Sequence, residues 1–161
     1  MDDYTDMRAT QKLLGDRTIA ALFTSATKAD TARDALKSAG FKDVAITRSE
    51  EIEIGNAPGP IHKHSFWDGL TALFGSGEDA HLYGEGVRRG HNLVTVHVSD
   101  TRAAEAIAIL DAQKPVNIDD HAQMWRSQGW TAEGASTEPS RRDPTAGNGR
   151  VRSYLQMIDP L

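Results

Sequence analysis

The chain has no cysteine among its 161 residues. This excludes disulfides, thiolate metal sites, iron–sulfur clusters and cysteine nucleophiles. It also lacks any apolar run approaching the ~20 residues that a membrane-spanning helix needs. Basic residues are fewer than acidic ones, 18 against 23, and the formal net charge is −5. Nucleic acids and anionic membranes bind net positive faces, so we expect neither as a partner.

The first residues, Met1-Asp2-Asp3-Tyr4, have neither the basic start nor the apolar stretch of a secretory signal. We therefore expect a cytoplasmic protein. Hydrophobic residues make up 39%, below the usual apolar share, so part of the chain is expected to lie outside the core. The length suits one domain with tails, and we interpret residues 1–16 as a mobile N-terminal arm.

Residues 17–130 have the pattern of an α/β domain. An apolar run at 18–23 predicts a central strand, and strong alternation at 92–99 predicts another. Two strand–helix–strand (βαβ) halves result, with strands at 18–23, 41–49, 92–99 and 115–118, helices at 27–39 and 101–113, and a helical insertion at 65–89. This order predicts a ferredoxin-like α+β sandwich with a four-stranded, mainly antiparallel sheet. A doubly wound parallel sheet is the alternative, for which four strands are few.

A last helix is expected at 119–130, and the composition then changes. Residues 131–149 are rich in Ser, Thr, Gly, Pro and Ala, which predicts a disordered linker. Apolar residues return at Val151, Tyr154, Leu155 and Ile158, whose spacing lines one face of a helix. A helix this short is not stable alone. Residues 150–161 are therefore either a tail without a role or a docking peptide for the protein's own oligomer or another protein.

The densest group of polar side chains lies at 78–91. Its ligand or interface candidates are Glu78, His81, Glu85, Arg88, Arg89 and His91. His81 and Glu85 are four residues apart on a helix and could share a metal or a proton. A metal would need further ligands from His62, His64 or His91. The alternative is a solvated helix whose acidic start and basic end suit the helix dipole. We predict neither a metal nor a cofactor.

The remaining candidates are tryptophans. Trp67 and Trp125 are expected to close the core, whereas Trp130 follows Gly129 at the domain edge and is an interface candidate. The sequence has no Gly-x-Ser-x-Gly nucleophile elbow and no phosphate loop following a strand. We predict no catalytic residue.

Three segments together resemble a bacterial family of general stress proteins induced by heat and low temperature. They are SFWDGLTALFG at 65–75, GEDAHLYGEGVRRG at 77–90 and DDHAQMWRSQGW at 119–130. The first strand and helix, 18–40, fit the same pattern, so the resemblance covers residues 17–130. The N-terminal arm and the tail have no counterpart, and Gly84 stands where a bulkier helix residue is expected.

The resemblance implies a stress-linked protein with no established enzymatic activity, and it carries over no catalytic residues. We expect a non-catalytic protein that acts through homo-oligomerisation or protein association. Our reason is that a four-stranded sheet covered by helices on one face leaves the other face, with Thr95 and His97, able to pair with a second copy. The alternative is a small-molecule or metal sensor that uses the residues at 78–91.

Overall fold

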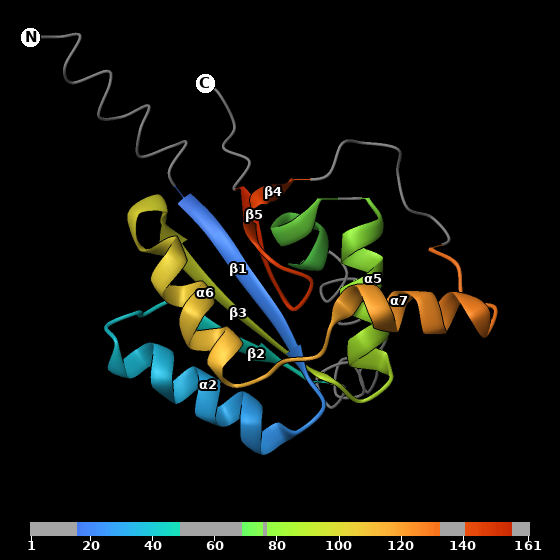
Figure 1. The fold of residues 1–161 in the computed structure, drawn as a ribbon, viewed down its shortest axis with the longest axis horizontal. Helices are drawn as coiled ribbons and strands as arrows, with labels where there is room; N and C mark the ends of the chain where they lie inside the picture. Colours follow the sequence, from blue (N-terminus) through green and yellow to red (C-terminus); the bar gives the residue numbers. More distant parts are fainter. Residues whose placement is uncertain (1–15, 49–68, 76, 133–140, 156–161) are drawn as a thin grey trace, which may run out of the picture.

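The computed structural model describes residues 16–48, 69–75, 77–132 and 141–155. Within them, five strands form one sheet in the order β2-β3-β1-β5-β4, and every neighbouring pair is antiparallel (Figure 1). The strands are β1 Asp16–Phe23, β2 Val44–Thr47, β3 Asn92–Ser99, β4 Arg142–Gly147 and β5 Val151–Leu155. The predicted α/β class and antiparallel pairing are confirmed. The predicted number of strands is wrong, and so is the parallel alternative.

Strand β1 is central because its side chains are apolar on both faces. It pairs with β3 from Asp16↔Ser99 to Phe23↔Asn92, and with β5 from Arg17↔Leu155 to Ala21↔Val151. Every residue from 18 to 23 is buried. A continuous apolar run is what a strand covered on both faces requires.

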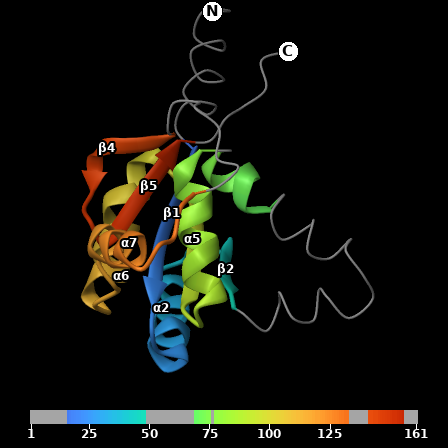
Figure 2. The ribbon, with the colours of Figure 1, turned by 90° about the vertical axis from the view of Figure 1, so that its right-hand side faces the viewer.

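Helices cover both faces of the sheet (Figures 1 and 2). On one face, α2 (Ala26–Ser38) and α6 (Ala103–Ala112) pack on alternate residues of β1 such as Ile19 and Ala21. On the other face, α5 (Glu78–Arg88) and α7 (Ile118–Ser127) pack on Ala20 and Leu22. The molecule is therefore a three-layer α/β/α sandwich.

The second helical layer corrects the expectation of a sheet face that is open for pairing. Thr95, expected to point outward into a dimer interface, is buried, and only His97 of the two is exposed. The reason is that α5, predicted as part of an insertion, packs across this face together with α7. Self-association through the sheet face therefore loses its physical basis.

The C-terminal part of the chain differs most from the prediction. Residues 115–118 form no strand: the Val116 amide donates to the Leu22 carbonyl at 2.8 Å, and α7 begins at Ile118. The place beside β1 is taken by β5. Val151, Tyr154 and Leu155 thus lie in a strand of the sheet and not on the face of a docking helix. A five-residue strand is stabilised here because its neighbours satisfy its backbone groups, which no isolated helix of that length could achieve.

The expected linker at 131–149 is structured over its described part. Residues 142–147 form β4, which is joined to β5 by a tight turn. The Asn148 side-chain oxygen accepts hydrogen bonds from the Arg150 and Val151 amides, at 2.8 and 3.0 Å. Gly147 has a φ of +84°, and a Cβ there would lie 2.3 Å from the Val151 carbonyl oxygen. A turn built on Gly and Asn explains a composition that otherwise indicates disorder.

Several predictions concern residues that lie wholly or partly outside the described part of the chain. They are residues 1–15 of the N-terminal arm, the loop histidines His62 and His64, Trp67, residues 133–140 of the linker, and Ile158 with the rest of 156–161. Asp16, the last residue of the predicted arm, is the first residue of β1. Trp125 is 1% exposed, which confirms that it belongs to the core.

Candidate functional site

The predicted polar residues of α5 separate into two groups in space. Glu85 is buried, and its carboxylate accepts hydrogen bonds from Arg88 at 3.2 Å and Arg89 at 2.7 Å. Arg89 also donates to the Gln128 side-chain oxygen at 2.9 Å, and its guanidinium carbon lies 5.1 Å from the centre of the Trp125 ring. Glu85 therefore fixes two arginines at the end of α5 that lies beside α7.

His91 and Trp130 complete this group. The Trp130 ring is 6.1 Å from that of Trp125, and the His91 ring is 6.2 Å from it, both measured between ring centres. We call Arg88, Arg89, His91, Gln128 and Trp130 the α5–α7 surface. Four of its members are predicted site residues. Gln128 was not predicted, because it lies 39 positions from Arg89 in the sequence and only the fold brings the two together.

Next to His91 lies a half-buried histidine that was not predicted, His121. The His121 ring lies 5.5 Å from that of His91 and 5.8 Å from that of Trp125, between ring centres. Burial lowers the pKa of His91, and the nearby His121 and Arg89 lower it further. The i, i+4 spacing of His121 and Trp125 on α7 was the available signal.

The two predicted residues at the start of α5 do not join this surface. Glu78 forms an ion pair with Arg126 of α7. His81 is half-buried on α5. In the part of the chain that the structure describes, no three His, Asp or Glu side chains are grouped so that they could hold a metal ion.

A buried polar network joins α5, α7 and β5. The guanidinium of Arg152, 3% exposed, bonds to Asp119 and lies 3.4 Å from a carboxylate oxygen of Asp79. The Tyr154 hydroxyl donates to Asp79 at 2.7 Å and lies 3.0 Å from the Tyr83 hydroxyl. Burial raises the pKa of both tyrosines. The network therefore links α5 and α7 to β5 through hydrogen bonds and ion pairs.

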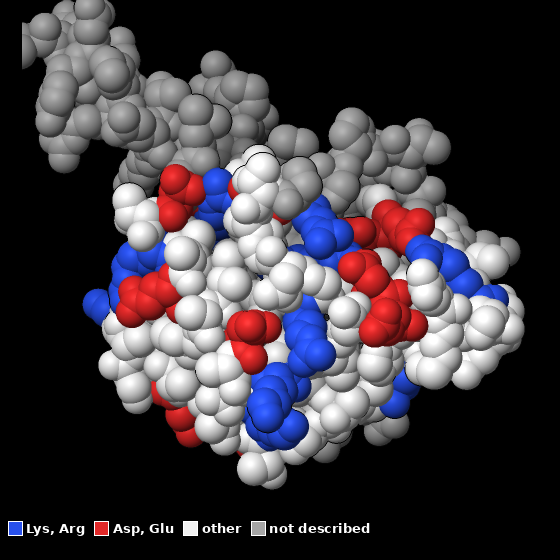
Figure 3. All heavy atoms as spheres, viewed as in Figure 1, with Lys and Arg blue, Asp and Glu red and all other residues white. Residues whose placement is uncertain are grey.

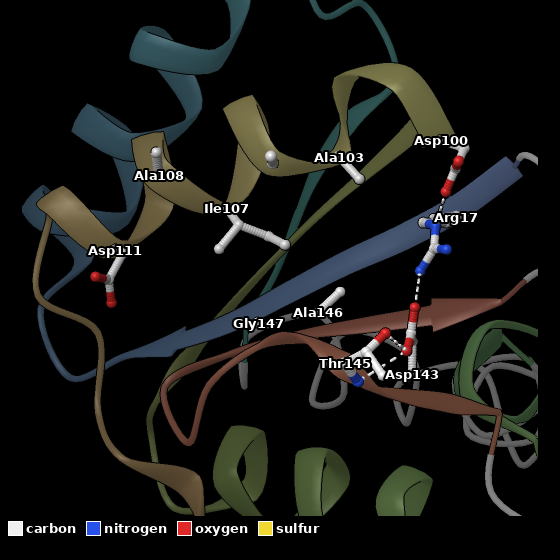
Figure 4. Close-up of a pocket in the computed structure, with 11 residues that line it drawn as sticks. Arg17, Asp100, Ala103, Ile107, Ala108, Asp111, Asp143, Thr145, Ala146 and Gly147 are labelled. Atoms are coloured by element: carbon white, nitrogen blue, oxygen red, sulfur yellow. Dashed lines mark hydrogen bonds and ion pairs between the residues drawn. The ribbon is translucent and has the colours of Figure 1, made fainter.

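A cavity of about 450 Å³ lies on the opposite face of the sheet, between α6 and β4 (Figure 4). Ala104, Ile107 and Ala108 of α6 form its apolar wall, and Thr145 and Ala146 of β4 face them. We call this cavity the α6–β4 pocket. The sequence analysis did not predict it, because β4 lay in the supposed linker.

Charged groups stand at both ends of the α6–β4 pocket. At one end, Arg17 donates to Asp100 at 2.6 Å and to Asp143 at 2.5 Å. Asp143 also accepts from the Thr145 hydroxyl at 2.6 Å and the Thr145 amide at 2.9 Å. These Thr145 bonds, with the guanidinium of Arg17, lower the pKa of Asp143 to about 2. At the other end stands Asp111.

No protein-family model, curated protein or solved structure matches this chain. None of the helices described here is long and apolar enough to cross a membrane. The fold is a three-layer α/β/α sandwich with an antiparallel sheet, and a fold alone does not define a function.

Proposed function

We propose that this chain is a non-catalytic stress-response protein of the bacterial general stress family, acting through protein association. The family assignment is supported by the chain order of the elements. The halves β1-α2-β2 and β3-α6-β5, with α5 between them, correspond to a ferredoxin-like unit in which β5 is the fourth strand and β4 an added edge strand.

The α5–α7 surface is the feature that best supports the proposed association. Arginine and tryptophan are the residues most enriched at the energetic centres of protein interfaces. Here Glu85 and Gln128 hold Arg89 in place, so little side-chain freedom remains to be lost on binding. Arg88 is 64% exposed beside them and is available to an acidic partner. We propose that this partner is a second copy of the chain.

The polar groups of this surface favour binding over catalysis. Glu85, the carboxylate nearest the exposed arginines, already accepts hydrogen bonds from both of them. A general base must be within reach of the substrate proton that it abstracts, and Glu85 is instead turned inward and paired. The surface therefore offers cations and an indole for contact, and its one carboxylate is already paired.

Sedimentation equilibrium of the full chain tests self-association through this surface. We expect a dimer or larger species for the wild type, dissociation for Arg88→Glu and Trp130→Ser, and no change for Arg33→Glu. Arg33 is the matched control because it undergoes the same charge change on α2, on the other face of the sheet. A wild-type mass of 17.5 kDa at micromolar concentration would refute self-association.

A metal sensor is the second candidate function. His91 and His121 bring two imidazole rings to 5.5 Å between their centres, and imidazole is the commonest protein ligand of zinc and nickel. A metal that binds only the folded chain raises its unfolding midpoint. We expect zinc or nickel to raise the midpoint of the wild type more than that of His121→Ala. Equal shifts would remove this candidate.

A further inference from the structure

The α6–β4 pocket combines an apolar middle with anionic ends. Helix α6 presents Ala104, Ile107 and Ala108 along one stripe. Asp111 continues the same stripe by one turn, and Asp100 precedes it in the short 3₁₀ helix η1, Asp100–Arg102. With rises of about 1.5 Å per α-helical residue and about 2 Å per 3₁₀ residue, the Cα atoms of Asp100 and Asp111 are separated by about 17 Å along the axis.

The charges at the two ends do not cancel. Arg17 is shared between Asp100 and Asp143, which leaves one net negative charge at that end. Asp143 uses both of its oxygens within the fold, whereas Asp100 is 55% exposed and bonds to Arg17 through one oxygen. The exposed Asp111 carboxylate forms no ion pair with any described residue. The pocket thus carries about two negative charges, one at each end.

In Figure 3 the surface over α6 and the β4–β5 hairpin is mostly uncharged, and both acidic and basic side chains lie at its borders. Figure 4 places the Asp100–Arg17–Asp143 group at one end of the pocket, Asp111 at the other, and Ile107 between them. A complementary ligand has cationic ends and a slim apolar middle.

We propose that the α6–β4 pocket binds a linear aliphatic polyamine. Its ammonium groups would pair with Asp100 at one end and Asp111 at the other, and its methylene groups would cover the alanines and Ile107. An extended linear tetra-amine matches the separation of the two ends, whereas a short diamine reaches only one of them. The site is independent of the association proposed above, because α5 and α7 lie on the other face of the sheet.

Two other kinds of cation fit the pocket less well than a polyamine. A compact cation of equal charge meets one end of the pocket only and leaves the alanine wall exposed to water. A lysine-rich polypeptide carries its charges on side chains of a bulky backbone, for which β4 offers a poor template. Residue 144 of that strand is proline, which has no N–H, and the Thr145 amide is already bonded to the Asp143 side chain.

Isothermal titration calorimetry at low salt tests the proposal on the full chain. The titrants are spermine, spermidine, putrescine and cobalt(III) hexaammine, the last being a compact ion with the same charge as spermidine. We expect one saturable site, with affinity falling from spermine to putrescine, and spermidine binding at least about tenfold more tightly than cobalt hexaammine. Low salt is needed because exposed ion pairs are screened over about 10 Å at 0.1 M.

Variants locate the site. Asp111→Asn should weaken spermine binding by about fivefold, the upper end for one exposed ion pair. Asp120→Asn on α7 makes the same charge change outside the pocket and should leave binding unchanged within about twofold. Ala108→Phe should abolish binding by filling the pocket, with circular dichroism confirming that the variant is folded.

Several results would overturn the proposal. These are an absence of saturable spermine binding, equal effects of Asp111→Asn and Asp120→Asn, and equal affinity for cobalt hexaammine and spermidine. Tighter binding of a lysine-rich peptide than of spermine would assign the pocket to a protein partner instead.

Discussion

The packing of α5 on the sheet depends on Gly86, which makes Gly86→Ala an informative substitution. A Cβ at this position would lie 2.7 Å from Cδ1 of Leu22 and 3.5 Å from Cη2 of Trp125. Both neighbours are 1% exposed. Leu22 cannot turn away into solvent, and Trp125 occupies the space beside it. The added methyl group therefore forces α5, β1 or α7 to shift.

The size of the effect follows from two opposing contributions. Replacing glycine with alanine inside a helix stabilises it by about 0.5–1 kcal/mol. Overpacking a filled core costs about 1–3 kcal/mol. We expect the second to dominate, so that Gly86→Ala lowers the free energy of unfolding by about 1–2 kcal/mol.

Urea unfolding, followed by tryptophan fluorescence and by circular dichroism, measures the change. Gly69→Ala is the control, because a Cβ on Gly69 meets nothing within 4 Å. Because Gly69 is also helical and has room for a methyl group, Gly69→Ala should raise stability by up to about 1 kcal/mol. In a Leu22→Ala background the clash disappears, and Gly86→Ala should there become stabilising. An increase in stability from Gly86→Ala in the wild-type background would refute the reasoning.

Three further predictions concern the C-terminal part of the fold. Ending the chain after Arg150 removes β5 from its place between β1 and β4 and should abolish cooperative unfolding; a native circular dichroism spectrum and an unchanged midpoint would contradict this. Tyr154→Phe removes a buried hydrogen bond to the Asp79 carboxylate and should cost about 1.5–3 kcal/mol in urea unfolding, whereas no loss would show that the bond contributes nothing. The lowered pKa of Asp143, about 2 when folded against 3.8 ordinarily, means that its ionised form stabilises the fold above pH 3.8. That stabilisation should be lost as the pH falls toward 2, and an Asp143→Asn variant should show a smaller loss over the same range.

The α5–α7 surface was partly predictable because its members are close in sequence. Glu85, Arg88 and Arg89 are one helical turn apart, and a helix brings such residues together whatever surrounds it. The same local reasoning predicted the burial of Trp125. It could not predict that Glu78 pairs with Arg126, because that contact depends on how α7 crosses α5.

Helix α2 shows where local signals suffice and where they do not. The spacing of Ala29, Ala32, Ala35 and Leu36 predicts a helix that buries one stripe. Ala29, Ala32 and Leu36 are buried in α2, and Ala35 is partly exposed. Gly40 was expected to end that helix, and its φ of +98° is the conformation that glycine adopts most readily. At the other end, the sequence predicts Thr27 as the residue that caps the helix. Ser25 caps it instead, two residues earlier, because its side-chain oxygen accepts the hydrogen bond from the Lys28 amide.

The sequence by itself determined the elements whose pattern is local: the apolar run of β1, the alternation of β3, and the helical stripes of α2, α5 and α7. Only the tertiary structure decided that Val151 to Leu155 is a strand, since a segment buried on both faces loses the alternation that identifies it. The tertiary structure also decided the Arg152 network and the α6–β4 pocket. Their residues are far apart along the chain, as Arg17 and Asp143 are at 126 positions, and only the pairing of strands brings them together.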